Sequence, residues 1–317
     1  MITTRAVFAA LAAAAIAATS ACSGPSHDDP PPAPRESADA SPPAIAPIDT
    51  GSVISAPEQA PPAITVSPVI TKSATLAAGV KTAIPKRWKP PKKSAWQWQL
   101  SGKLNTSVNV PIYDVDLFYT TATQVKTLHS KKRKVICYFS AGSYESGRPD
   151  SAKFPAAVKG KKMDGWPEYW LDIRDSRVLK IMAARMDLCK KKGFDAVEAD
   201  NVDGYQNDTG FPLTAAQQLK YNKALASLAH ARGLAIGLKN DLDQVKSLQP
   251  YFDFAINEEC YTYNECTMLT PFIKAGKPVF HVEYEASRTK FCPKTKALGF
   301  SSMRKTWDLT AARYPCP

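Results

Sequence analysis

Short apolar runs that alternate with longer segments of helical periodicity are the feature that most restricts how residues 95–317 can fold. The clearest run is Phe194–Asp200, which begins with apolar residues and ends in acids. Residues 178–192 place Leu and Met at helical spacing, and Thr214 caps a second helical segment that stops at Gly233. The runs that we interpret as strands are Val110–Val115, Val135–Ser140, Trp170–Asp172, Phe194–Asp200, Leu234–Leu238, Phe252–Asn257 and Pro278–Val282, with a last one near Phe300.

Strand–helix alternation over about 220 residues predicts an α/β fold, and a (β/α)8 TIM barrel in particular. A doubly wound open sheet is the alternative, because it produces the same alternation. Such a sheet would be expected to carry a Gly-rich nucleotide-binding loop, and no such loop follows any of these strands. We therefore expect residues 95–317 to form a barrel.

Polar residues gather where the expected strands end, and barrel active sites lie at these carboxyl ends. Asp200 and Glu258 are 58 positions apart, which is about two strand–helix units of roughly 30 residues each. We therefore expect them on the fourth and the sixth strand, facing one cavity mouth and spaced to flank one bond. The other polar residues at strand ends are Ser140, Asp172, Lys239, Asn240 and Glu283.

Three acids, Glu198, Asp200 and Asp203, fall within six positions at the end of one expected strand. Like charges this close raise one another's pKa and cost stability, so packing alone seldom explains them. A catalytic carboxylate at the strand end accounts for the arrangement. A polar strand exit or a Ca²⁺ loop is the alternative.

The first 21 residues have the composition of an export signal. Arg5 precedes an Ala-rich apolar run that is too short to cross a bilayer, and small residues follow the run. The segment Thr19-Ser20-Ala21-Cys22 resembles the lipobox of bacterial lipoproteins, although Thr19 stands where Leu is usual. We expect an exported protein that is either secreted after ordinary cleavage or anchored to a membrane through an acylated Cys22.

Residues 22–94 are rich in Pro, Ala and Ser and contain 15 of the 26 prolines. Such a composition cannot bury a core, and it prefers extended polyproline conformations. We therefore expect a disordered tether between the export signal and a domain formed by residues 95–317.

Cysteine usage agrees with export. Apart from Cys22 the chain has six cysteines, and an even number in an exported chain favours disulfides. Fifteen pairings are possible, and our preference is for one short loop, one tie between a strand and a helix, and one at the C-terminus. A zinc site is the rival use, but the chain has no Cys-x₂-Cys pair and only four His. The preferred pairs are Cys137 with Cys189, Cys260 with Cys266 and Cys292 with Cys316.

The chain carries a formal net charge of +12, most of it in residues 95–317. Residues 1–94 contain nine Lys or Arg and six Asp or Glu, a net of +3, which leaves +9 for the rest. This excess could suit an anionic partner, but the basic runs 131–134 and 190–192 are typical of solvated helix ends and turns. No nucleic-acid-binding motif accompanies them, so we expect no nucleic-acid partner.

Seven short strings carry a resemblance to a known family. They are Trp96–Leu100, Tyr113–Asp116, Cys137–Glu145, Trp170–Asp172, Asp200–Tyr205, Asn257–Cys260 and Glu283–Tyr284. Taken together and in this order, they resemble glycoside hydrolase family 114, the endo-α-1,4-polygalactosaminidases. The resemblance extends over about residues 95–290.

The resemblance implies a (β/α)8 barrel that hydrolyses α-1,4-linked galactosamine polymers without a metal or another cofactor. It places the catalytic carboxylates on Asp200 and Glu258, and we assign Glu258 as the acid/base and Asp200 as its partner. The adjacent Glu259 leaves the second position open, because alternation along a strand points only one of two neighbours inward. The substrate-binding candidates are Asp114, Tyr138, Ser140, Asp172, Asp203, Tyr205, Lys239, Asn240, Glu259, Glu283 and Tyr284.

Other functions compete with a secreted or surface-anchored glycoside hydrolase. A non-catalytic barrel would bind an envelope polysaccharide without producing new reducing ends. An esterase would need a Gly-x-Ser-x-Gly motif and a metal deacetylase would need clustered His and Asp ligands, but the chain lacks that motif and has four His. We expect a monomer that acts on a galactosamine-containing polysaccharide and contacts a membrane only through the lipid anchor.

Overall fold

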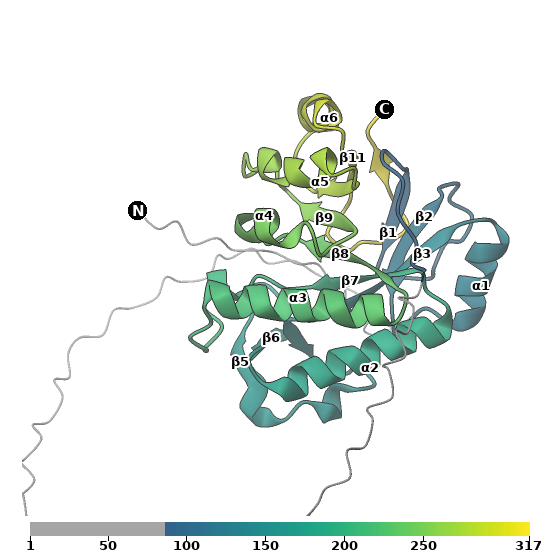
Figure 1. Ribbon diagram of the computed structural model, residues 1–317. Helices are drawn as coiled ribbons and strands as arrows, with labels where there is room; N and C mark the ends of the chain where they lie inside the picture. Colours follow the sequence, from purple (N-terminus) through teal and green to yellow (C-terminus); the bar gives the residue numbers. More distant parts are fainter. Residues whose placement is uncertain (1–85) are drawn as a thin grey trace, which may run out of the picture. The chain divides into compact units, whose positions relative to one another are not determined.

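The computed structural model describes residues 86–317 (Figure 1). The predicted export signal, Cys22 and the predicted tether up to residue 85 lie outside the described residues. Within residues 86–317, no helix is both long enough and apolar enough to span a membrane.

Eight parallel strands form the barrel that the sequence predicts. In sheet order they are β1 (Trp96–Gln99), β2 (Ile112–Asp116), β3 (Lys134–Ser140), β7 (Ala196–Asp200), β8 (Ala235–Lys239), β9 (Phe254–Glu258), β10 (Val279–Glu283) and β11 (Ser301–Arg304). A short strand, β12 (Tyr314–Pro315), pairs antiparallel with β11. The sheet curls until its first and last parallel strands meet, where Trp96 Nε1 donates to the carbonyl oxygen of Ser301 at 3.0 Å.

Two details of the strand prediction are wrong. One barrel strand was missed and one run was wrongly counted as a barrel strand, so the numbering of the later strands is unchanged. Residues 96–99 form the first barrel strand, which the sequence analysis did not count. Trp170 lies outside the barrel, in a separate antiparallel sheet, because a short apolar run does not reveal which strand it will pair with. Asp200 and Glu258 therefore still end the fourth and sixth barrel strands. The strands of the separate sheet are β4 (Ser143–Glu145), β5 (Lys159–Lys162) and β6 (Glu168–Leu171).

Helices connect the barrel strands and cover the outside of the sheet, with α2 and α3 side by side (Figure 1). The α-helices are α1 (Ala122–Ser130), α2 (Ser176–Lys192), α3 (Ala215–Ala231), α4 (Val245–Leu248), α5 (Thr270–Lys274) and α6 (Arg288–Ala297). The 3-10 helices are η1 (Ser151–Lys153), η2 (Ala156–Val158), η3 (Gly204–Gln206), η4 (Leu242–Gln244) and η5 (Cys266–Leu269).

Capping residues explain why the two long helices begin and end where the sequence predicts. Thr214 Oγ1 accepts from the Gln217 backbone at 3.2 Å, and the Gln217 side chain accepts from the Thr214 backbone at 2.9 Å, which is a capping box for α3. The chain leaves α2 at Gly193 and turns after α3 at Gly233. Both glycines have positive φ, +92° and +71°, which other residues adopt only with strain.

Alternation along the strands divides the apolar residues into an inner and an outer cluster. On β3, Ile136 and Tyr138 belong to the inner cluster, whereas Val135, Cys137 and Phe139 belong to the outer cluster with residues from the helices. The same alternation points every second residue of β7, β8 and β9 into the barrel, and the last inward position of each strand is polar.

The first described residues, 86–94, lie against the barrel although the sequence assigns them to the tether. Trp88 packs on the inner apolar cluster, and Arg87 Nε donates to Asp253 Oδ1 at 3.1 Å. Pro90 and Ser94 are buried.

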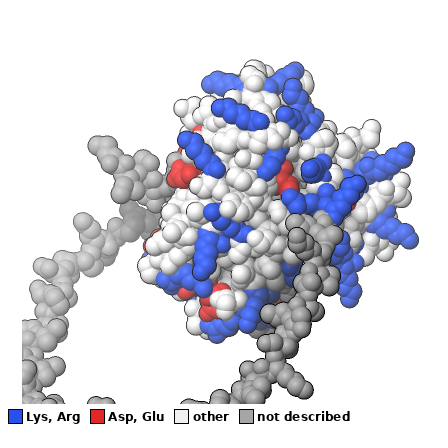
Figure 2. Space-filling model, viewed as in Figure 1, with Lys and Arg blue, Asp and Glu red and all other residues white. Residues whose placement is uncertain are grey.

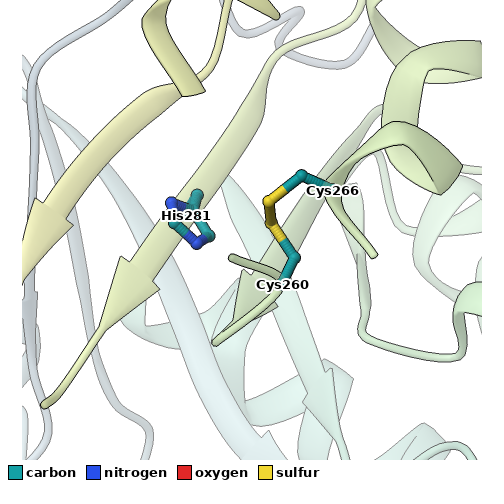
Figure 3. Close-up of side chains that lie close together, drawn as sticks. All are labelled: Cys260, Cys266 and His281. Atoms are coloured by element: carbon teal, nitrogen blue, oxygen red, sulfur yellow. A yellow bond between two sulfur atoms is a disulfide. The ribbon is translucent and has the colours of Figure 1, made fainter. Parts of the chain in front are cut away.

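The three preferred disulfides are all present, namely Cys137–Cys189, Cys260–Cys266 and Cys292–Cys316. The Cys260–Cys266 bond lies beside His281 of β10 (Figure 3). These three side chains could form a metal site by proximity, since their donor atoms lie within 4.8 Å of one another. The two sulfurs are bonded to each other, however, so neither is a thiolate that could bind an ion.

Basic side chains are spread over the face of the domain in Figure 2, where acidic side chains are few. Many of the acids are instead buried at the carboxyl ends of the barrel strands. The positive charge of the domain and the negative charge of its interior are therefore separated in space. Over a screening length of about 8 Å, a ligand in the barrel mouth would interact mainly with the acids.

Candidate active site

The fourth, fifth and sixth barrel strands bring three charged side chains together at their carboxyl ends. Lys239, at the end of β8, extends between β7 and β9. Its Nζ lies 2.8 Å from Asp200 Oδ1 and 2.9 Å from Glu258 Oε2. A third carboxylate, Glu198, lies one layer deeper on β7, with its Oε1 3.6 Å from the same nitrogen.

Lys239 is 1% exposed, and these acids stabilise its protonated, charged form. Burial alone would lower its pKa, but the carboxylates of Asp200, Glu258 and Glu198 outweigh burial and raise the pKa well above its usual value. The ammonium group also lies 5.1 Å from the centre of the Trp98 ring, a favourable cation–π distance. Lys239 is therefore a permanent cation between the predicted catalytic residues.

Three donors converge on the Asp200 carboxylate. Tyr138 OH donates to Oδ2 at 2.9 Å, while Lys239 Nζ and the backbone N–H of Asn201, at 2.7 Å, donate to Oδ1. Both oxygens are thus acceptors, and their orientation is determined by groups on three strands. This arrangement suits a carboxylate that acts as an anion.

Glu258 has a different environment. The Tyr284 hydroxyl donates to its Oε1, and Lys239 contacts its Oε2. Burial raises the pKa of Glu258 above its usual value, with Lys239 opposing the shift and the negative charge of Asp200 adding to it. Its side chain is as buried as that of Asp200, at 3% exposure each, so the difference between the two carboxyls lies in their partners. A carboxyl of this kind suits proton transfer.

One nitrogen atom contacts both carboxylates, and this limits their separation. The two oxygens that Lys239 binds are at most about 6 Å apart, the sum of the two contact distances, and the charge of Asp200 therefore raises the pKa of Glu258. Asp200 and Glu258, which end the fourth and sixth strands, therefore lie on either side of one ammonium group.

A second pair of acids lies deeper in the barrel. Burial raises the pKa of Asp114, on β2, to about 7 and the pKa of Glu198 well above its usual value. The negative charge of Asp114 adds to the effect of burial on Glu198, and Lys239 opposes it. Asp114 is thus placed below the cluster around Lys239 rather than at its mouth.

Asp203 and Tyr205 follow β7 and lie on the side of Asp200. Burial and the charge of Asp200 raise the pKa of Asp203 to about 6. Burial and the charge of Asp241, a residue not among the predicted site residues, raise the pKa of Tyr205 to about 12. Asp241 directly follows the candidate Asn240, and the run of polar residues at this strand end was a signal for it.

Asn240 joins two strand ends. Its Oδ1 accepts from the Glu258 backbone at 3.0 Å and from Asn257 Nδ2 at 3.1 Å. Like Asn201 and Glu259, the residues that follow β7 and β9, it has a positive φ, between +49° and +60° for the three. Backbone strain at three neighbouring strand ends is typical of functional sites.

Three candidates lie apart from the cluster. Ser140 Oγ accepts from Asn201 Nδ2 at 2.9 Å and thereby supports the turn after Asp200. Asp172 follows the separate sheet and pairs with Arg174 at 2.7 Å. Glu283 points out of the barrel and accepts from Thr262 Oγ1 at 2.6 Å, so it braces the loop after β9.

Two aromatic residues near the cluster were missed as site residues. Trp98 stacks beneath Lys239, although the sequence analysis used it only as part of a family string. Trp307, near the C-terminus, stacks on Tyr284 with ring centres 3.9 Å apart. The chain between Tyr284 and Trp307 contains a helix and a strand, so no local pattern could have indicated this contact.

Comparisons with known proteins identify the family and related structures. The model of glycoside-hydrolase family GH114 matches residues 77–317. The crystal structure of Ega3 from Aspergillus fumigatus in complex with galactosamine is 40% identical, has a TM-score of 0.71, and is aligned over 74% of this chain and 100% of that chain.

Two further proteins are more distant. An uncharacterized protein of Deinococcus radiodurans is 27% identical, and the alignment covers 60% of this chain and 71% of that protein. The glycoside hydrolase domain of PelA from Pseudomonas aeruginosa is 13% identical, with a TM-score of 0.56 over 71% of this chain and 98% of that chain. At that identity, the PelA domain shows a likeness of fold alone.

Proposed function

Because the chain belongs to glycoside-hydrolase family GH114, we propose that it is an exported enzyme that cleaves α-1,4-galactosaminidic linkages in galactosamine polymers. The substrate is supported by the likeness to Ega3, whose crystal structure contains galactosamine. Export is supported by the composition of the first 21 residues and by the three disulfides.

The observation that carries the mechanism is the pair of carboxylates on either side of Lys239. Their bound oxygens lie at most about 6 Å apart, which fits the separation of about 5–5.5 Å in retaining glycosidases better than the 6.5–9.5 Å of inverting ones. We therefore assign a retaining reaction, in which one carboxylate attacks the sugar and the other transfers a proton.

Asp200 is the nucleophile in this reaction, since all its donors support an anion. Its oxygen forms a bond to the anomeric carbon while Glu258 gives its proton to the leaving oxygen, and the glycosidic bond breaks. Glu258 then takes a proton from a water molecule, the water oxygen bonds to the anomeric carbon, and the bond from that carbon to Asp200 breaks. Lys239 keeps its proton throughout and fixes the positions of the two carboxylates through its contacts with both.

The proposal is tested with Asp200→Asn and Glu258→Gln in the full chain. Each variant should lower the rate of chain cleavage by at least about 10³-fold and leave the circular-dichroism spectrum unchanged. Asp187→Asn is the control, because Asp187 is an exposed acid of α2 that pairs with Arg232. Product length is read by mass spectrometry and the anomeric configuration of the first product by NMR.

Normal turnover in either variant would refute the assignment of that residue. An inverted first product would refute the retaining reaction but leave the two carboxylates in place. Binding of polymer by the unmodified chain without new reducing ends would show a non-catalytic barrel instead.

A further inference from the structure

Glu259 is a buried acid without a partner. It directly follows Glu258 and is 7% exposed. Among residues 86–317, no group donates a hydrogen bond to its carboxylate or forms an ion pair with it. A buried charge normally has such a partner, because its burial is otherwise costly. The carboxylate therefore has no cation among the described residues, and its oxygens, which are not fully buried, remain open to a ligand.

The charged neighbours of Glu259 are also negative and therefore do not compensate its charge. The charges that act on it belong to Glu283, Glu258 and Glu285, all of them acids, and together with burial they raise its pKa to about 7. Lys239, the buried cation of the neighbouring cluster, is engaged by Asp200, Glu258 and Glu198. A ligand with a positive charge would supply what is missing.

The other two acids of the group have donors of their own. Glu283 accepts from His281 Nε2 at 2.7 Å, from the Tyr261 backbone at 2.8 Å and from Thr262 Oγ1 at 2.6 Å. Glu285 accepts from Trp307 Nε1 at 2.9 Å. Glu259 is thus the one acid of the three to which no described residue donates a hydrogen bond.

The backbone of Glu259 is held in a defined position. Its N–H donates to the Val282 carbonyl oxygen at 2.8 Å, and its own carbonyl oxygen accepts from Tyr263 at 3.0 Å. The Cys260–Cys266 disulfide closes the loop that follows (Figure 3). Its φ of +59° is strained for a residue with a side chain, so this position is maintained by the surrounding contacts. Such preorganisation suits a binding group.

The surroundings also suit a sugar. Tyr263, whose ring is close enough for Glu259 to influence its hydroxyl, is 52% exposed. On the Glu258 side, Tyr284 and Trp307 form an aromatic stack. Exposed aromatic rings pack on the apolar faces of sugars. The charge of Glu259 is close enough to interact with Glu258 and with the Tyr284 hydroxyl that donates to Glu258, so Glu259 lies beside the proposed acid/base.

We infer that Glu259 binds the ammonium group of a galactosaminyl residue next to the cleaved bond and thereby selects stretches of polymer whose amines are free. This inference rests on the proposed function, because it names a feature of the same substrate. An N-acetylated residue carries no positive charge at that position and would leave Glu259 unpaired, so it should be cleaved less efficiently.

The test compares Glu259→Gln with the unmodified full chain on deacetylated and on N-acetylated galactosamine oligomers. Loss of one charge-assisted hydrogen bond should lower kcat/KM on deacetylated oligomers by roughly 10- to 100-fold and change it less than about twofold on N-acetylated ones. Glu259→Asp, which keeps the charge, should retain part of the preference. Asp187→Asn, which removes an exposed acid of α2, should retain all of it.

Thermal unfolding shows whether each variant is folded, and Glu259→Gln should be no less stable because it removes an unpaired charge. An equal loss on both kinds of oligomer, or no loss on either, would overturn the inference and leave the proposed function standing. If the unmodified chain cleaves neither, the proposed function fails, and calorimetric binding of the two oligomers decides on Glu259 alone. Weaker binding of only the deacetylated oligomer by Glu259→Gln would support it; equal or absent binding would overturn it.

Discussion

Replacing Lys239 with Met would remove the cation that holds the site together. The methionine side chain has a similar length and is apolar, so it fills much of the same space without the charge. Three buried carboxylates would then lose their shared partner, which in the native protein lies 2.8, 2.9 and 3.6 Å from their oxygens. The structure therefore predicts a large loss of stability that is electrostatic in origin.

The magnitude follows from the cost of leaving buried charges uncompensated. Breaking a buried ion pair by removing one partner costs about 3–5 kcal/mol, and we expect this loss in the free energy of unfolding at about pH 8. Lys239 lowers the pKa of Glu258 and Glu198, so these values rise further in the variant. The folded variant then binds more protons than its unfolded state, and its stability improves as the pH falls.

At about pH 5 the carboxyls of the variant can take up protons, and the loss should shrink to about 1–3 kcal/mol, the cost of neutral but unsatisfied polar groups. Urea denaturation followed by tryptophan fluorescence measures both values. The same substitution is also made in Asp200→Asn/Glu258→Gln, where two of the three charges are already absent. In that background the loss should be about 1–3 kcal/mol at either pH.

Equal losses in both backgrounds would refute this reasoning, because the cost would then come from packing and not from charge. A loss that grows as the pH falls would refute it as well. The activity of Lys239→Met on galactosamine oligomers should fall in parallel, since the orientation of Asp200 and Glu258 depends on the ammonium group.

Two further predictions concern stability. Burial raises the pKa of Asp241 to about 8, so its stabilising contribution is present below the unfolded pKa and is lost as the pH rises toward about 8. Between about pH 5 and pH 8, the Tm of Asp241→Asn should therefore fall less than that of the native protein, and parallel curves would contradict this. Removal of the Cys137–Cys189 disulfide, which closes a separation of 52 residues, should cost about 4 kcal/mol, against about 2 kcal/mol for Cys260–Cys266 with its separation of six. Denaturation of the paired Cys→Ala variants without reductant measures both, and the reverse order would show that loop entropy does not dominate.

The sequence predicts those residues of the candidate site that lie at the carboxyl ends of recognisable strands. Asp200, Lys239 and Glu258 were identified because each ends a short apolar run, and such runs end on the same face of a barrel. Glu283 ends a similar run, yet it faces outward, because it lies one position past the inward residue Val282. Asp172 was predicted as a site residue because it follows a short apolar run, but that run belongs to the separate antiparallel sheet outside the barrel.

The sequence determined the barrel, the chemical types at its mouth and the preferred cysteine pairs, since these depend on local periodicity and composition. Only the tertiary structure decided that one lysine nitrogen joins two carboxylates, that Tyr284 and Trp307 stack, and that Glu259 is left without a partner. The physical reason is that such contacts depend on how the sheet curls and how its strands are staggered. That closure is set by packing across the whole barrel and is not contained in any single segment.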